Sequence, residues 1–112
     1  MLYYSRYEGM QVMKKVTFQL SPTDRIDMMS KIINIVGERL HEHKMAGTKF
    51  KDIAKAIGVP KERISEIYNQ KYINERTLRS LLHYGWIDAG DLLSPELSDN
   101  QLKVIEQVIG QA

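Results

Sequence analysis

The side chains best suited to chemistry in this 112-residue chain are basic, and they are concentrated in its middle third. Residues 44–79 carry nine Lys and Arg against four Asp and Glu, a net charge of +5, whereas residues 1–43 carry +1 and residues 80–112 carry −4. Ammonium and guanidinium groups bind the phosphates of a polyanion, although a solvated helix face can carry the same residues. The charge distribution therefore favours a nucleic-acid-binding middle segment without establishing one alone.

Other chemistries have weaker support in the sequence. The chain has no cysteine, which excludes a disulfide framework and a cysteine-based zinc site. His41 and His43 are two residues apart on a predicted helix and point to different sides, and Glu38 with His41 has ligand-like spacing but no second pair. No glycine-rich phosphate loop or nucleophile motif is present. We therefore expect no metal, no cofactor and no enzymatic activity.

The basic segment contains a pattern that would position its polar side chains. In residues 48–70, TKFKDIAKAIGVPKERISEIYNQ, Ile53 and Ile57 lie one helical turn apart, and Gly58 follows where a helix must stop. Pro60 suits the first position of a second helix, and Ala54 is small enough for close packing. The pattern predicts two short crossed helices, a helix-turn-helix that presents its second helix to the DNA major groove. The alternative to DNA binding is a helical hairpin that only packs within the fold, or a helix-turn-helix that contacts another protein.

Three further helices are expected around this motif. Ser21 and Pro22 form a strong helix start, and the helix should run to about residue 43. Its apolar stripe would comprise Ile26, Met29, Ile33, Val36 and Leu40. Asn74 or Ile73 precedes a helix that Gly85 ends, residues 88–95 form a loop or one helical turn, and Ser98 with Gln101 caps a last helix.

Composition and patterning together predict one all-α, five-helix domain with a short N-terminal β-strand. The chain has a mass of 13.0 kDa, with 43% hydrophobic and 27% charged residues, as in ordinary globular proteins. We expect a flexible arm over residues 1–13 and a DNA-binding domain over 14–97, which includes an alternating strand at 14–20. A C-terminal helix should occupy residues 98–112. No apolar run could span a membrane and no secretory signal is evident, so we expect a cytoplasmic protein.

Two apolar stripes lack an evident partner in so small a domain. They comprise Val16, Phe18 and Leu20 on the strand, and Leu102, Ile105, Val108 and Ile109 on the last helix. Burial of either stripe across a two-fold axis would support a homodimer or higher homo-oligomer. Alternatively, the last helix folds back on its own core. The strand also resembles the start of ribbon-helix-helix proteins, with Lys15, Thr17 and Gln19 as base readers, but the next helix is too long for that fold.

The stretch from Thr48 to Leu82 resembles the DNA-binding domain of the phage lambda repressor and Cro superfamily. The residues that carry the resemblance are Ala54, Gly58, Val59, Ile64, Ile67 and Asn69, followed by a helix starting near Asn74. A weaker similarity to the lambdoid CII-type activators rests on Gly58, Val59, Lys61, Ile64, Ser65, Leu81, Leu82 and Gly85. This second resemblance implies a homo-oligomer that activates transcription beside RNA polymerase.

The resemblance also implies which side chains contact DNA. It places a groove-facing set on the second helix, namely Lys61, Glu62, Ser65, Glu66 and Asn69, with Arg63 beside them. The same set remains when Ile64, Ile67 and Tyr68 turn inward. Lysine can donate to guanine or phosphate, and glutamate can accept from cytosine, although Glu62 can equally serve the helix dipole. Phosphate contacts are expected from Thr48, Lys49, Lys51, Gln70, Lys71 and Tyr72.

The sequence thus predicts a sequence-specific regulator that binds a double-stranded DNA operator as a homo-oligomer. Repression by promoter occlusion is the expected mode, with CII-like activation as the alternative. A third possibility is a protein-interaction module, such as an antitoxin that binds both a toxin and its own operator.

Overall fold

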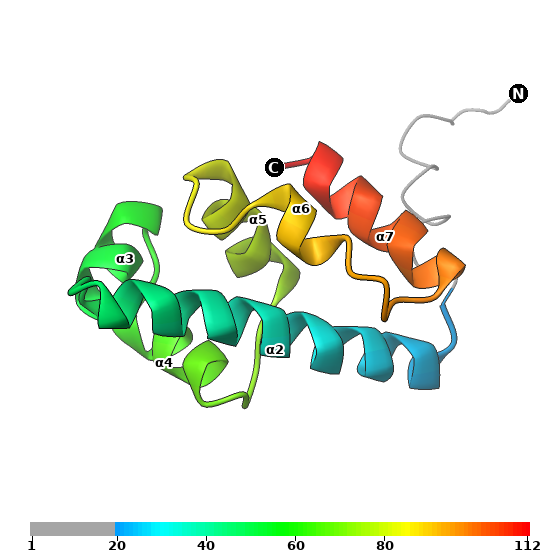
Figure 1. Ribbon diagram of the computed structural model, residues 1–112, viewed down its shortest axis with the longest axis horizontal. Coiled ribbons are helices and arrows are strands. Elements are labelled where there is room, and N and C mark those ends of the chain that lie inside the picture. Colours follow the sequence, from blue (N-terminus) through cyan, green and yellow to red (C-terminus); the bar gives the residue numbers. More distant parts are fainter. Residues whose placement is uncertain (1–19) are drawn as a thin grey trace, which may run out of the picture.

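The computed structural model describes residues 20–112, which form helices and connecting turns without a strand (Figure 1). Its elements are α2 (Pro22–Met45), α3 (Phe50–Ile57), α4 (Lys61–Tyr68), α5 (Glu75–His83), α6 (Ala89–Leu92) and α7 (Asp99–Gly110). The five expected helices are present, and α6 adds the single turn that the sequence allowed between residues 88 and 95. The predicted arm at 1–13 and the predicted strand at 14–20, except for Leu20, lie outside the described residues.

The long helix α2 organises the domain. Ser21 caps it by accepting a hydrogen bond from the backbone N–H of Asp24 at 3.1 Å, and Pro22 occupies its first turn, as predicted. Figure 1 shows α2 running along the length of the molecule, with α3 and α4 near its C-terminal end and α7 beside its N-terminal half. Each of α4, α6 and α7 packs against it. The helix therefore has different partners along its length.

The buried face of α2 differs from the predicted stripe at its N-terminal end. Met28, Ile32, Ile33, Val36, Gly37 and Leu40 are buried. Ile26, predicted to lie on this face, is 71% exposed, and Met29 is only partly buried. The stripe was expected from the 3-4-3-4 spacing of apolar residues alone. Since α7 covers the N-terminal half and α4 the remainder, the buried face shifts along α2.

Each of the helices α2 to α7 contributes to one hydrophobic core. Its most deeply buried apolar side chains, each at most 2% exposed, are Ile32, Val36, Leu40, Ile53, Ala54, Ile64, Ile67, Leu78, Leu81, Leu92 and Ile105. The short helix α6 is fixed to α2 by an ion pair between Arg39 Nη2 and Asp91 Oδ1 at 2.7 Å. The core thus holds α3 and α4 at one end of the molecule with their outer faces free of other described helices.

The last helix, α7, folds back on the core rather than presenting its apolar stripe to a second copy. Ile105 is 1% exposed and Val108 is 5% exposed, and Leu102 and Ile109 are partly buried against the same core. Because α7 packs on α2 and α5, Ile105 and Val108 contribute to the core of their own chain. Both side chains are thus buried within the chain, and homo-oligomer formation stays a prediction.

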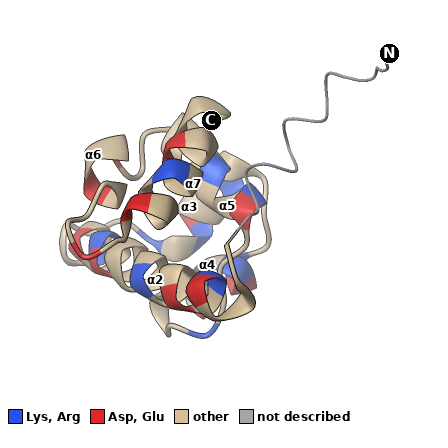
Figure 2. Ribbon diagram, turned by 90° about the vertical axis from the view of Figure 1, so that its right-hand side faces the viewer, with Lys and Arg blue, Asp and Glu red and all other residues tan. Residues whose placement is uncertain are grey.

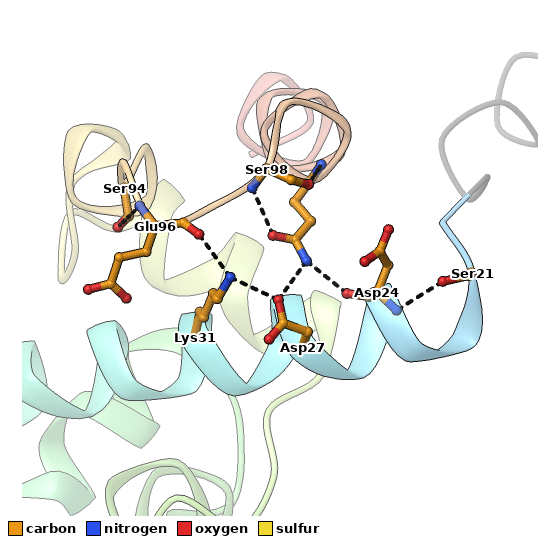
Figure 3. Close-up of polar contacts among 8 residues, drawn as sticks. Ser21, Asp24, Asp27, Lys31, Ser94, Glu96 and Ser98 are labelled. Carbon is orange, nitrogen blue, oxygen red and sulfur yellow. Dashed lines mark hydrogen bonds and ion pairs between the residues drawn. The ribbon is translucent and has the colours of Figure 1, made fainter.

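A polar junction joins the start of α7 to α2 (Figure 3). Gln101, only 1% exposed, donates from Nε2 to Asp24 O at 3.0 Å and to Asp27 Oδ2 at 2.9 Å. Its Oε1 accepts from Ser98 N at 3.0 Å, which completes the predicted capping box. The Gln101 amide, followed by Lys31 at 2.8 Å, lowers the pKa of Asp27 by stabilising its carboxylate. The buried amide therefore has a partner for each of its polar groups.

Among the helices of residues 20–112, none is both long and apolar enough to cross a lipid bilayer.

Candidate nucleic-acid interface

The two eight-residue helices α3 and α4 pack against each other and are joined by residues 58–60. Gly58 ends α3 in the left-handed conformation, with φ 76° and ψ 33°. Its N–H donates to Lys55 O at 3.3 Å and that of Val59 donates to Ala54 O at 3.0 Å, the pair of bonds that closes a Schellman motif. Pro60 immediately precedes α4, one position earlier than predicted.

The inner face of α4 is fixed against α2. Ile64 and Ile67 are at most 1% exposed. The backbone of α2 approaches that of α4 at Gly37, where an added Cβ would lie 3.6 Å from Ile67 O. At the end of α4, the Tyr68 hydroxyl lies 3.0 Å from His41 Nδ1, and the two rings stack with centroids 6.0 Å apart. These contacts pack α4 against α2 while its opposite side faces outward.

The outer side of α4 carries the residues predicted to face a DNA groove. Lys61, Glu62, Arg63 and Asn69 are exposed, whereas Ser65 and Glu66 are half-buried. Arg63 Nη1 lies 3.2 Å from Glu66 Oε1, so these two side chains form an ion pair on the helix surface. Figure 2 shows the resulting mixture of acidic and basic residues along α4. Such a surface offers donors and acceptors side by side, as recognition of base edges requires.

Residues 70–72 continue the same surface beyond α4. Lys71 and Tyr72 are exposed, and Tyr72 retains 52% of its accessible area. Gln70, predicted to touch the DNA backbone, adopts a φ of +58° and donates from Nε2 to Asn34 Oδ1 of α2 at 2.9 Å. The side chain of Gln70 is therefore already engaged within the protein.

A basic depression of about 370 Å³ lies where α3 begins. Its lining contains four lysines and no acidic residue: Lys44, Gly47, Thr48, Lys49, Phe50, Lys51 and Lys61. No side chain caps the α3 N-terminus, so its first backbone N–H groups have no side-chain partner within the helix. Amides at a helix N-terminus together with lysines are suited to bind phosphate. The structure thus brings the predicted residues of the loop and α3 together with Lys61 of α4.

Lys44 is a member of this depression that the sequence did not single out. Its Nζ lies 4.9 Å from the centroid of the Tyr68 ring and 5.9 Å from that of Phe50. These two rings are themselves in contact, with centroids 4.9 Å apart. The only sequence signal for Lys44 was its inclusion in the basic segment at 44–79, because its position depends on where α2 ends relative to α4.

The two histidines near the end of α2 have separate contacts. His43 Nε2 donates to the carbonyl oxygen of Trp86 at 2.8 Å, and its ring meets the Trp86 ring edge-on at 5.2 Å. His41 instead contacts Tyr68. Within residues 20–112, no three His, Cys, Asp or Glu side chains gather closely enough to hold a metal ion.

Of the remaining predicted interface residues, Val16 and Phe18 lie outside the described part of the chain. Leu20 is 9% exposed and belongs to the hydrophobic core. Comparison with protein-family models, curated proteins and solved structures found no match to this chain.

Proposed function

We propose that this protein is a sequence-specific double-stranded DNA-binding regulator in which α3 and α4 act as a helix-turn-helix. In this proposal α4 enters the major groove and the α3 N-terminus rests on the phosphate backbone. The observation that carries the proposal is the adjacency of two surfaces. The lysine-lined depression at the start of α3 shares Lys61 with the exposed polar face of α4.

The two surfaces have different tasks in this mechanism. Lys44, Lys49 and Lys51 neutralise phosphates, which supplies affinity for any duplex and releases condensed counterions. Lys61, Ser65 and Asn69 lie where side chains of α4 can reach base edges. Glu66 can accept from cytosine N4 once its ion pair with Arg63 is exchanged for a base contact. The resemblance of residues 48–82 to the lambda repressor and Cro superfamily supports this division.

Association of two copies is part of the proposal, because two half-sites increase both affinity and specificity. The core-facing residues Ile105 and Val108 of α7 are buried within their own chain. The partly buried Leu102 and Ile109 remain on its outer edge. Repression by occlusion of a promoter requires only DNA binding and self-association. CII-like activation would require a contact with RNA polymerase, and an antitoxin would co-purify with a toxin.

Salt dependence of DNA binding tests the phosphate contacts. The affinity of the parent protein for a duplex should fall by roughly 0.9 log units per log unit of salt for each phosphate neutralised. The double variant Lys49→Ala/Lys51→Ala should bind all duplexes more weakly, with a salt slope smaller by about 1.8, or 0.9 for each lost contact. Lys103→Ala removes an equivalent exposed charge from α7 and serves as the matched control.

The same titration can refute the proposal. A salt-independent affinity would exclude the phosphate contacts, as would equal slopes for the lysine double variant and the parent. A reduced slope in Lys103→Ala would show that charge on any face contributes equally, so that the depression has no special role. Circular dichroism of each variant establishes that the fold is retained.

A further inference from the structure

An apolar groove of about 310 Å³ lies on the side of the domain formed by α2, α5 and α7. Its walls are mostly aliphatic and thioether side chains: Met28, Met29, Leu78, Val104, Ile105 and Val108. The rim is polar: Arg25, Asn74 and Glu75 also line the groove, as does Tyr72, which is 52% exposed. Water against the aliphatic walls is poorly hydrogen-bonded, so an apolar occupant is favoured there.

The course of the chain indicates which apolar segment reaches this groove. Leu20, the first described residue, lines the groove, and its side chain is 9% exposed. Ser21 follows in an extended conformation, with φ −62° and ψ 159°. In the preceding sequence, KKVTFQL, apolar residues alternate with polar ones, so an extended chain would place Phe18 and Val16 on the same side as Leu20.

We infer that Phe18, followed by Val16, docks into this groove of its own chain and closes the core between α2, α5 and α7. An extended chain carries Phe18 only about 7 Å from Leu20, which is already seated there. A short tether holds Phe18 at an effective concentration of about millimolar or above, whereas a second copy must bind at its solution concentration. Intrachain docking is therefore favoured over an exchange of segments between copies. This inference concerns the folded domain and is independent of DNA binding.

Engineered cysteines test the docking directly, because the natural chain has none. In the full-length variant Phe18→Cys/Met29→Cys, one cysteine lies on the proposed docking side and the other on the groove wall. Oxidation should give an intramolecular disulfide in a species of monomer mass, at a rate independent of protein concentration. The matched control Thr17→Cys/Met29→Cys places the first cysteine on the opposite side of the segment. It should oxidise at least about tenfold more slowly, since a bridge requires Cα atoms within about 7 Å.

Two results would overturn the inference. A covalent dimer as the main product would show that the segment docks on a second copy. Equal rates for the Thr17 and Phe18 variants would show that no particular side of the segment faces the groove.

Thermal unfolding gives a second readout that needs no crosslink. Phe18→Ser should lower the Tm by about 4 to 8 °C, the shift expected for loss of one modest apolar contact in a domain near this size. Thr17→Ser should leave the Tm unchanged, and sedimentation should give both variants the mass of the parent. An unchanged Tm for Phe18→Ser, or a loss of mass, would contradict intrachain docking.

Discussion

The side-chain amide of Gln70 donates a hydrogen bond to Asn34 Oδ1, 2.9 Å away on α2. Gln70 is also the only non-glycine residue with a positive φ among those described, at +58°. Its N–H donates to Ile67 O at 2.9 Å and that of Lys71 donates to Glu66 O at 2.8 Å, the same pair of bonds that Gly58 and Val59 form at the end of α3. Gln70 therefore ends α4 and ties it to α2.

Substitutions at Gln70 should separate its backbone role from its side-chain role. Gln70→Ala loses the bond to Asn34 and keeps the left-handed strain, whereas Gln70→Gly loses the bond and relieves the strain. A left-handed residue with a Cβ costs roughly 1–2 kcal/mol relative to glycine. The glycine variant should thus be more stable than the alanine variant by about 1 kcal/mol in urea denaturation. Equal stability would show that the turn after α4 adopts another conformation when the side chain is removed.

Gly37→Ala should stabilise the protein, although Gly37 lies at the crossing of α2 and α4. An added Cβ would meet Ile67 O at 3.6 Å, an ordinary van der Waals distance, and alanine favours a helix interior over glycine by about 0.5–1 kcal/mol. Gly58→Ala is the contrasting variant and should destabilise by about 1 kcal/mol, because Gly58 has a φ of +76°. Destabilisation by Gly37→Ala in urea denaturation would indicate a tighter crossing than the structure has.

The junction between Asp27 and Gln101 predicts a pH-dependent contribution to stability. The pKa of Asp27 in the folded protein is lowered from 3.8 by the Gln101 amide and then by Lys31. A lowered folded pKa means that the contribution is present above the unfolded pKa and is lost as the pH falls through the folded pKa. Asp27→Asn should therefore be less stable than the parent at pH 7, and this difference should shrink below about pH 4. If denaturation curves gave the same difference in unfolding free energy between the two proteins at pH 3 and pH 7, the ionised Asp27 carboxylate would make no such contribution.

Substitutions on the outer face of α4 should change which bases are preferred rather than overall affinity alone. Ser65→Ala or Glu66→Ala should alter the preference at one or two positions, by roughly 1–3 kcal/mol for a good bidentate contact. Arg63→Ala removes the ion-pair partner of Glu66 and should strengthen any cytosine preference that depends on this glutamate. Binding-site selection from random duplexes measures both effects, and an unaltered preference in Glu66→Ala would show that Glu66 reads no base.

The elements predicted best from the sequence were those fixed by local interactions. Ser21 and Ser98 cap the expected helices, and Asn74 accepts from Thr77 N at 2.7 Å at the start of α5. Gly58 has the expected left-handed conformation. Each of these features depends on residues no more than five apart, so the sequence alone contains the relevant information.

Features that depend on tertiary contacts were not predicted. Ile26 is exposed because the N-terminal half of α2 packs on α7, a partner distant in sequence. Gln101 was assigned only a capping role, yet it is buried through bonds to Asp24 and Asp27, 77 and 74 residues away. Lys44 enters the basic depression through the rings of Phe50 and Tyr68. No local pattern distinguishes these residues from others of their type.

The most direct test of DNA recognition is a protection experiment on duplexes selected from a random pool. The proposal predicts enrichment of a particular sequence and protection of two half-sites whose centres lie about 34 Å apart, one turn of the double helix. The Ser65→Ala and Lys49→Ala/Lys51→Ala variants should respectively change the enriched sequence and weaken protection everywhere. Absence of any enriched sequence, with uniform protection of random DNA, would contradict sequence-specific recognition by α4.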